Sequence, residues 1–439
     1  MKRRDPIHRA AVGRTPTGLL ILAIVAMGSG LSGCRRLGAT DTALVDALPH
    51  LAAEPELRIG DRDDPNVGFS RVIGIDVGRD GRIYVEEAMV PEIRVYSPDG
   101  VLLDRIGRRG AGPGEFDGAP RFGVVGDTVW AVTNGPDRIT LFRTDGTLLS
   151  ARPVRGLRVP LPRGWGWVLP WVMRPDGRFI GHFARVGGSR GDPPPPPIDP
   201  EQPIPWPFVL FDPSGSVTDT IGWAPRPPPR MWRPPSQSDG GYRITEIGGR
   251  RMEVPMPPTT LARWETLSDG YVVIEEEFAE TEDDGVFTVS RFAFSGDTVY
   301  SRALHYRPTR YSAAELDSIA ARAARGEPGG GVSYSPMGGA PPPDWERIAN
   351  SLRAEMQFPE FKLPIRSARV TSDGSVWLHL QNVVPTTAHW LLIDPGGRAR
   401  GTLDLPSNIR ILWSHDDVVW AVETDDLDVP WVVRITLHG

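Results

Sequence analysis

The sequence predicts an all-β fold, a six-bladed β-propeller, and three observations lead to that prediction. A unit of short apolar strands joined by tight turns recurs six times along the chain. The last unit stops one strand short at Gly439, and a single strand of the same kind precedes the first unit. The 49 Gly and 46 Pro among 439 residues favour turns over helices. Small sheets of this kind cannot bury both faces alone, so neighbours must pack face to face around an axis.

The clearest unit lies between Val72 and Gly107. Its four predicted strands are 72–77, 82–86, 93–96 and 101–106. Asp80-Gly81 separates the first two strands, and Pro98-Asp99-Gly100 separates the last two. These dipeptides supply the positive φ that tight hairpin turns require, so the unit is expected to form an antiparallel meander.

Five further units repeat the pattern with decreasing fidelity. Each has a turn followed by an apolar strand, and the turns fall at 126–127, 175–177, 268–270, 372–374 and 416–417. The sixth unit lacks its outer strand. Leu57-Arg58-Ile59-Gly60 repeats the endings seen at 104–107 and 219–222. We therefore expect this N-terminal strand to complete the last blade and close the ring.

Three insertions interrupt the regular spacing, at about 184–206, 223–259 and 306–362. The first contains the run Pro193 to Pro197, which is typical of an extended surface loop. The third contains a capping box, Ser312 with Glu315, followed by apolar residues at helical spacing. A second amphipathic segment begins near Trp345. The sequence thus predicts a small helical insertion on the rim between blades 4 and 5.

The N-terminus has the features of an export signal. Five basic residues precede a stretch of nine apolar residues at 19–27, which is too short for a helix that spans a membrane. Leu31-Ser32-Gly33-Cys34 follows, and Cys34 is the only cysteine. This segment resembles the lipobox of bacterial lipoproteins; the alternative is an ordinary signal peptide with a chance cysteine. The resemblance implies cleavage before Cys34 and lipidation of its thiol.

On this interpretation residues 1–33 are the lipoprotein signal peptide, 34–53 a lipidated tether and 54–439 the propeller. Arg35, rather than Asp, follows the cysteine. By resemblance to known sorting rules, Arg35 favours an outer-membrane anchor, with the domain facing the periplasm or the cell surface.

A family resemblance is carried by 81–85, 93–100 and the run Gly110-Ala111-Gly112-Pro113-Gly114-Glu115-Phe116. These residues resemble the NHL-type six-bladed propellers, strongly over 67–150 and fairly over 365–437. The run 110–116 is similar to that family's loop between consecutive blades. The resemblance implies architecture rather than chemistry, because the family includes binding platforms and, in a few branches, enzymes.

The charge balance argues against a nucleic-acid partner. Without residues 1–33 the chain has 44 Lys and Arg against 54 Asp and Glu, a formal net charge of −10. Proteins that bind a phosphate backbone need clustered positive charge to displace counterions.

Two sets of residues are candidates for a site. Five positions after the turn glycine, or its equivalent, four blades have a polar residue: Glu86, His182, Glu275 and His379. On one face these could bind a metal ion or act as an acid and a base; the alternative is solvated or hydrogen-bonded strand ends. Trp165, Trp167 and Trp171 could form an aromatic platform for a sugar or peptide, although tryptophan between blades is more often core.

Two functions remain open. The favoured one is a non-catalytic envelope lipoprotein, anchored by the Cys34 lipid, whose propeller binds a protein, peptide or glycan. The alternative is a metal-assisted hydrolase or lyase with a metal ion in the central channel or on one face. No other cofactor is expected, because no phosphate-binding loop, nucleophile elbow or zinc helix is present in the sequence.

Overall fold

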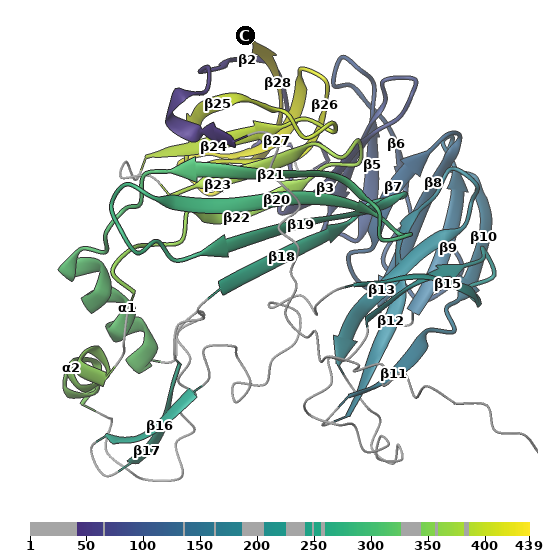
Figure 1. The fold of residues 1–439 in the computed structure, drawn as a ribbon. Helices are drawn as coiled ribbons and strands as arrows, with labels where there is room; N and C mark the ends of the chain where they lie inside the picture. The colour runs from purple at the N-terminus through teal and green to yellow at the C-terminus, as the bar shows by residue number, and fades with distance from the viewer. Residues whose placement is uncertain are drawn as a thin grey trace, which may run out of the picture. The chain divides into compact units, whose positions relative to one another are not determined.

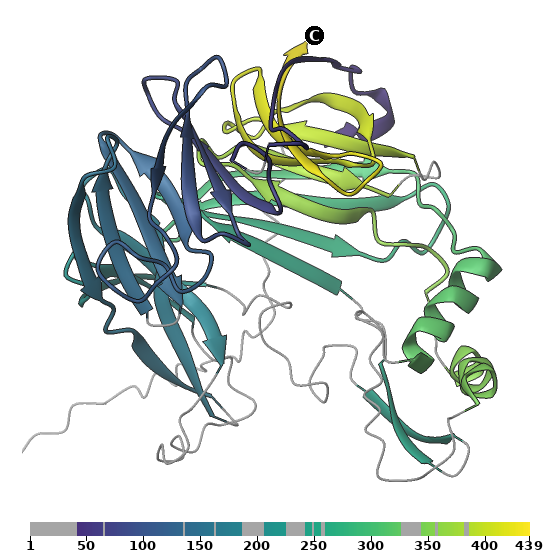
Figure 2. The same cartoon turned by 180° about the vertical axis from the view of Figure 1, so that it is seen from behind.

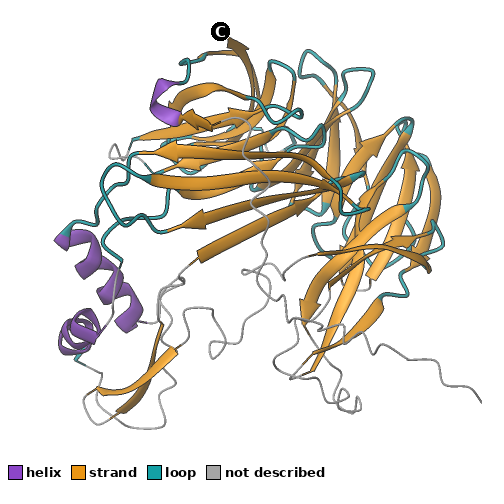
Figure 3. Cartoon of the chain, in the orientation of Figure 1, coloured by secondary structure: helices purple, strands orange, loops and turns teal. Residues whose placement is uncertain are grey.

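The computed structural model describes most of one compact unit, Ala39–Gly439. The described residues are 42–64, 66–134, 137–161, 164–186, 206–224, 242–247, 250–255, 260–325, 344–355, 359–381 and 386–439. They consist mainly of strands, as Figure 3 shows. Six of the sheets are the blades of a six-bladed β-propeller, as predicted (Figures 1 and 2).

The first three blades follow one another along the chain. Blade 1 consists of β3 (Val72–Val77), β4 (Ile83–Glu87), β5 (Glu92–Tyr96) and β6 (Leu102–Ile106). Blade 2 consists of β7 (Arg121–Val125), β8 (Thr128–Asn134), β9 (Asp137–Arg143) and β10 (Leu148–Pro153). Blade 3 consists of β11 (Leu157–Leu161), β12 (Gly164–Met173), β13 (Phe179–Val186), β14 (Trp206–Phe211) and β15 (Val217–Ala224).

The other three blades complete the ring. Blade 4 consists of β18 (Thr260–Thr266), β19 (Gly270–Glu277), β20 (Gly285–Ala293) and β21 (Thr298–Tyr306). Blade 5 consists of β22 (Ile365–Val370), β23 (Val376–Leu380), β24 (Thr387–Ile393) and β25 (Ala399–Pro406). Blade 6 consists of β26 (Ile409–His415), β27 (Val418–Thr424), β28 (Pro430–His438) and β2 (Ala52–Ile59).

The hairpin turns have the predicted backbone geometry. Gly81 and Gly100, in the two turns of blade 1, have φ of 79° and 83°. A residue with a β-carbon adopts such angles only at a cost in energy. Asp-Gly turns thus determine where each strand of the meander ends.

The ring is closed by β2, as predicted from its sequence. β2 runs antiparallel to β28, with Ile59 opposite Val432. Ile59 is only 3% exposed and packs with Trp420 and Val432 in the core between blades 6 and 1. Figure 1 shows this N-terminal strand beside the C-terminal strand. Blade 6 therefore consists of segments from both ends of the described chain.

Residues 42–53 belong to the propeller rather than to the tether in which we placed them. β1 (Thr42–Leu44) pairs in parallel with β21 and adds a fifth strand to blade 4. Val45, in the short 3₁₀ helix 45–47, is 3% exposed and packs in the core between blades 4 and 5. The sequence did not indicate this because a three-residue strand has no periodicity of its own.

The core consists of six clusters of buried apolar side chains, and each cluster joins two neighbouring blades. Fully burying one such side chain contributes about 1.5–3 kcal/mol. Face-to-face packing around the ring therefore supplies the main stabilisation that a single sheet lacks.

The loop 110–116 connects blades 1 and 2. Phe116 is fully buried and packs edge-on against Phe142 of blade 2. Gly107 has φ of 79°, and a β-carbon there would overlap the Phe116 ring. The ring thus packs against a backbone position that accommodates only glycine.

The helical insertion between blades 4 and 5 is present, as α1 (Ala313–Arg325) and α2 (Trp345–Glu355). Ser312 and Glu315 form the predicted capping box, and Lys362 donates to Glu315 at 2.5 Å. The two helices contact each other, as both views show (Figures 1 and 2). No helix among the described residues has the length and apolar character needed to cross a bilayer.

The second insertion contains an element that the sequence did not predict. β16 (Tyr242–Ile247) and β17 (Arg250–Pro255) form a separate two-stranded sheet. The proline run 193–197 lies outside the described residues.

Candidate ligand site on the propeller axis

Charged and aromatic side chains from five blades converge on the axis. We call six of them the axial cluster: Glu86, Arg121, Trp171, His182, Glu265 and Arg369. Arg369 of blade 5 lowers the pKa of Glu86 in blade 1, and Glu265 of blade 4 raises that of Arg121 in blade 2. Neither pair of blades is adjacent in the ring, so these groups influence each other across the axis.

Arg121 lies at the centre of the cluster and makes no hydrogen bond or ion pair with any described residue. Its guanidinium carbon lies 3.1 Å from the centre of the Trp171 ring. Trp171 is the extra residue of a β-bulge, because Pro170 and Val172 pair with the consecutive residues Gly181 and Ile180. Bulges re-aim side chains, and this one accounts for the ring facing Arg121. Burial lowers the Arg121 pKa to about 10, so the guanidinium stays charged at neutral pH.

Glu86 is a buried acid, and one of its carboxyl oxygens has no partner among the described residues. It is 5% exposed, and its Oε1 atom has no hydrogen-bond partner among the described residues. Burial raises its pKa to about 8, against the opposing effect of Arg121 and Arg369. Gly74 on β3 is opposite Glu86, and a β-carbon at Gly74 would lie 2.7 Å from Oε2. The missing side chain at Gly74 therefore leaves space for the Glu86 carboxyl.

His182 is buried and uncharged. It is 2% exposed, and burial, together with the charge of Arg121, holds its pKa well below the usual range. Its Nδ1 atom lies 2.5 Å from the Thr266 hydroxyl, while Nε2 has no partner among the described residues. The imidazole contacts Trp171, with ring centres 3.9 Å apart, and meets Trp264 edge-on at 4.9 Å. These contacts hold the ring in a fixed orientation.

Glu265 and Arg369 complete the cluster. Glu265 is solvent-exposed, yet desolvation by the surrounding blades raises the pKa of its carboxyl. The Glu265 carboxyl is therefore in contact with solvent but has protein atoms on its other sides. Arg369 uses Nε to donate to the Leu412 carbonyl at 3.0 Å, and burial lowers its pKa.

Further groups on the inner strands are already hydrogen-bonded. Asp76 accepts from the Val124 amide at 2.7 Å and from the Trp413 indole at 3.0 Å, and burial raises its pKa to about 6. Arg410 donates to the Val72 carbonyl at 2.6 Å. These contacts join inner strands of neighbouring blades.

The structure brings together two of the four residues predicted from the strand positions. Glu86 and His182 both lie within electrostatic reach of Arg121. Glu275 on β19 is exposed, and His379 on β23 stacks on Trp390 with ring centres 5.0 Å apart. Across the described part of the chain, no group of three or more His, Cys, Asp and Glu side chains is placed to hold a metal ion.

The three tryptophans do not form one platform. Trp171 belongs to the axial cluster, whereas Trp167 is half-buried with Arg158 over its ring at 5.0 Å. For Trp165 the structure describes the backbone, in β12, and the side chain lies outside what is described.

Sequence reasoning missed Arg121, Glu265 and Arg369. All three lie on the first strands of their blades, whereas the predicted site residues lie on the strands that follow the turns. A signal was available, because a charged residue in an innermost strand must face either another blade or the axis.

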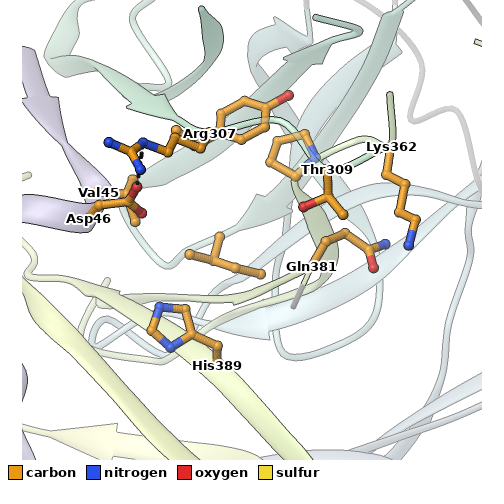
Figure 4. A pocket seen from close by; sticks show the side chains of 10 residues that line it. Val45, Asp46, Arg307, Thr309, Lys362, Gln381 and His389 are labelled. Carbon is orange, nitrogen blue, oxygen red and sulfur yellow. Dashed lines mark ion pairs between the residues drawn. The ribbon is translucent and has the colours of Figure 1, made fainter. Parts of the chain in front are cut away.

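A separate pocket of about 70 Å³ lies where the helical insertion joins the propeller (Figure 4). Its charged groups already have partners. Arg307 pairs with Asp46 at 3.6 Å, as the dashed line shows, and His389 lies 2.7 Å from Asp404. Lys362 donates a hydrogen bond to Glu315. The charged side chains that line this pocket are therefore all paired with described residues, unlike Arg121 in the axial cluster.

Comparisons with known proteins identify no family for this chain. No protein-family model matches the chain, and no curated protein matches it. A solved structure from Bacteroides fragilis, described as an exported protein, is 12% identical, with a TM-score of 0.44 over 91% of this chain and 99% of its own. A DUF4221 family member from Bacteroides vulgatus is 9% identical, with a TM-score of 0.41 over 89% and 99%. Virginiamycin B lyase from Staphylococcus aureus is 12% identical, with a TM-score of 0.36 over 89% and 100%. At these values none of them carries an argument about activity, and the propeller assignment rests on the sheets themselves.

Proposed function

We propose that this protein is an exported, lipid-anchored binding protein, and that its propeller binds a peptide or glycan group at the axial cluster. The binding role is non-catalytic. The anchor is the Cys34 lipid, and the cluster supplies the specificity.

The observation that carries this proposal is the set of polar atoms without partners around Arg121. The guanidinium makes no hydrogen bond with a described residue, and Glu86 Oε1 and His182 Nε2 are buried without partners among the described residues. Leaving a buried polar atom unsatisfied costs about 1–3 kcal/mol. Such groups destabilise the fold. A ligand or ordered water that forms hydrogen bonds with them therefore binds more favourably.

Binding explains this arrangement better than catalysis. His182 is held uncharged between two indoles, and its one hydrogen bond is to Thr266. The two arginines and the aromatic rings of the cluster are groups that recognise and orient a ligand.

Site-specific photo-crosslinking tests the proposal. A benzophenone amino acid is placed at Trp171 or at Trp223 in the full chain, expressed with its signal and irradiated in cells. Both tryptophans belong to blade 3, but Trp223 lies on the outer strand β15 and is 56% exposed. We expect a discrete adduct from the Trp171 position that is lost when Arg121→Gln is added. Equal adducts from both positions, or none from Trp171 in a folded protein, would contradict the proposal.

A further inference from the structure

We propose that the axial cluster recognises a carboxylate group, and this inference rests on the proposed function. It goes further because it names the chemical group of the ligand and the side chain that binds it, Arg121.

The first support is the charge on the inner strands. Arg121, Arg369 and Arg410 come from β7, β22 and β26, three separate blades. The acids near the axis are Asp76, Glu265 and Glu86, and Glu86, with a pKa of about 8, is mostly protonated at neutral pH. The chain without residues 1–33 is strongly acidic, so an excess of arginine charge on the axis differs in sign from the net charge of the protein. Such a local field attracts anions from solution.

The second support is the geometry of Arg121. Its guanidinium carbon lies over the Trp171 ring, 3.1 Å from the ring centre, and the guanidinium makes no hydrogen bond with a described residue. A guanidinium edge presents two parallel N–H donors, which match the two oxygens of a carboxylate. Contact with the Trp171 ring restricts the movement of the guanidinium, so less conformational entropy is lost when an anion binds.

The third support is the pair of buried groups near the Arg121 guanidinium. Glu86 Oε1 and His182 Nε2 are both unpartnered among the described residues and more than nine-tenths buried. With a pKa of about 8, Glu86 is mostly protonated at neutral pH and can donate a hydrogen bond. A neutral acid beside an arginine suits an incoming carboxylate, whereas a second carboxylate would repel it.

The remaining acids favour a monoanion over a phosphate dianion. Glu265 lies within electrostatic reach of Arg121, and Asp76 of Arg369. Their charge offsets part of the arginine field and opposes a doubly charged ligand. A peptide C-terminus and a uronic acid both present a single planar carboxylate, so the test must distinguish these two sources.

Calorimetric titration of the full chain in detergent provides the test. The probes are acetyl-trialanine with a free carboxylate, the same peptide amidated, glucuronate and glucose. We expect one of the two acids to bind about tenfold or more tightly than its neutral counterpart, a difference of about 1.4 kcal/mol. The acid that binds identifies the source as peptide or glycan.

Variants test whether the Arg121 guanidinium causes the preference for the acid. Arg121→Gln should abolish the preference for the acid, and Arg121→Lys should retain only part of it, because an ammonium lacks the planar fork. Arg143→Gln is the matched control, since Arg143 is an exposed arginine on β9 of the same blade. It should leave binding unchanged.

Two results would overturn the inference: equal binding of acid and amide, or binding unaffected by Arg121→Gln in a variant with unchanged melting temperature. If adducts at Trp171 persist while neither acid is preferred, the carboxylate inference fails and the binding function stands.

Discussion

Gly74 and Glu86 show how one residue pair sets the chemistry of the axis. Because Gly74 lacks a side chain, the Glu86 carboxyl occupies the space over β3 and is removed from water. Desolvation disfavours the charged form and raises the pKa to about 8, although Arg121 on β7 and Arg369 on β22 oppose the shift. Folding therefore favours the protonated acid.

This shift predicts a pH-dependent stability that can be measured. The folded pKa lies above the ordinary value of 4.5, so the stabilisation is complete below pH 4.5 and is lost as pH rises towards 8. The loss is up to about 1.4 kcal/mol per pH unit. Glu86→Gln should remove this slope and be more stable than the parent at pH 8, as urea unfolding at pH 5 and pH 8 would show.

Glu275→Gln is the control, because Glu275 occupies the corresponding position of blade 4 but is exposed. It should keep the slope of the parent. A Glu86→Gln variant with the parent's slope would show that this carboxyl titrates normally in the folded chain.

The axial cluster was only partly predictable from single residues. Glu86 and His182 can be identified by counting positions after each turn, because the repeat places these residues at equivalent points of their strands. Arg121 did not stand out, since its role depends on Trp171 of the next blade. That ring faces Arg121 only because of a bulge, and a bulge has no signature in the sequence of one strand.

Among the elements, β2 joins the two ends of the described chain, and its role is open to a direct test. Ile59→Ala leaves a cavity between blades 6 and 1, beside Trp420. We expect a loss of about 2–5 kcal/mol in unfolding free energy. Amide exchange in β2 and β28 should accelerate more than in β8, because the closing pair opens first.

Leu103→Ala serves as the comparison, since Leu103 lies on the outer strand β6 and is 51% exposed. It should change stability by no more than about 0.5 kcal/mol. Equal effects of the two substitutions would mean that β2 does not hold the ring closed.

Elements that repeat were predictable, whereas elements that depend on distant partners were not. Turn dipeptides such as Asp80-Gly81 locate the hairpins, and the sequence Leu57-Arg58-Ile59 identifies the missing strand. In contrast, β1 exists because β21 lies alongside it, and β16 with β17 lies within a proline-rich insertion. Local patterning does not indicate such pairings.

For the whole molecule, anchoring and folding are expected to be independent. The described propeller begins at β1, after Cys34, and its six core clusters join adjacent blades without any disulfide, since Cys34 is the only cysteine. More than one acyl chain is needed for stable attachment, because a single chain binds membranes only marginally. On the proposal made above, the lipid determines where the protein is located, and the packed blades determine its structure.

Cys34→Ser tests this separation. We expect the variant to incorporate no labelled fatty acid and to leave the membrane fraction, while its melting temperature matches that of the parent, because the core clusters of the described residues begin at Val45, after the substituted residue. Thr40→Ala, also upstream of β1, should remain lipidated and membrane-bound. If Cys34→Ser stayed with the membranes and still carried label, the anchor would lie elsewhere. If it left the membranes but unfolded at a lower temperature, the lipid would contribute to the stability of the fold.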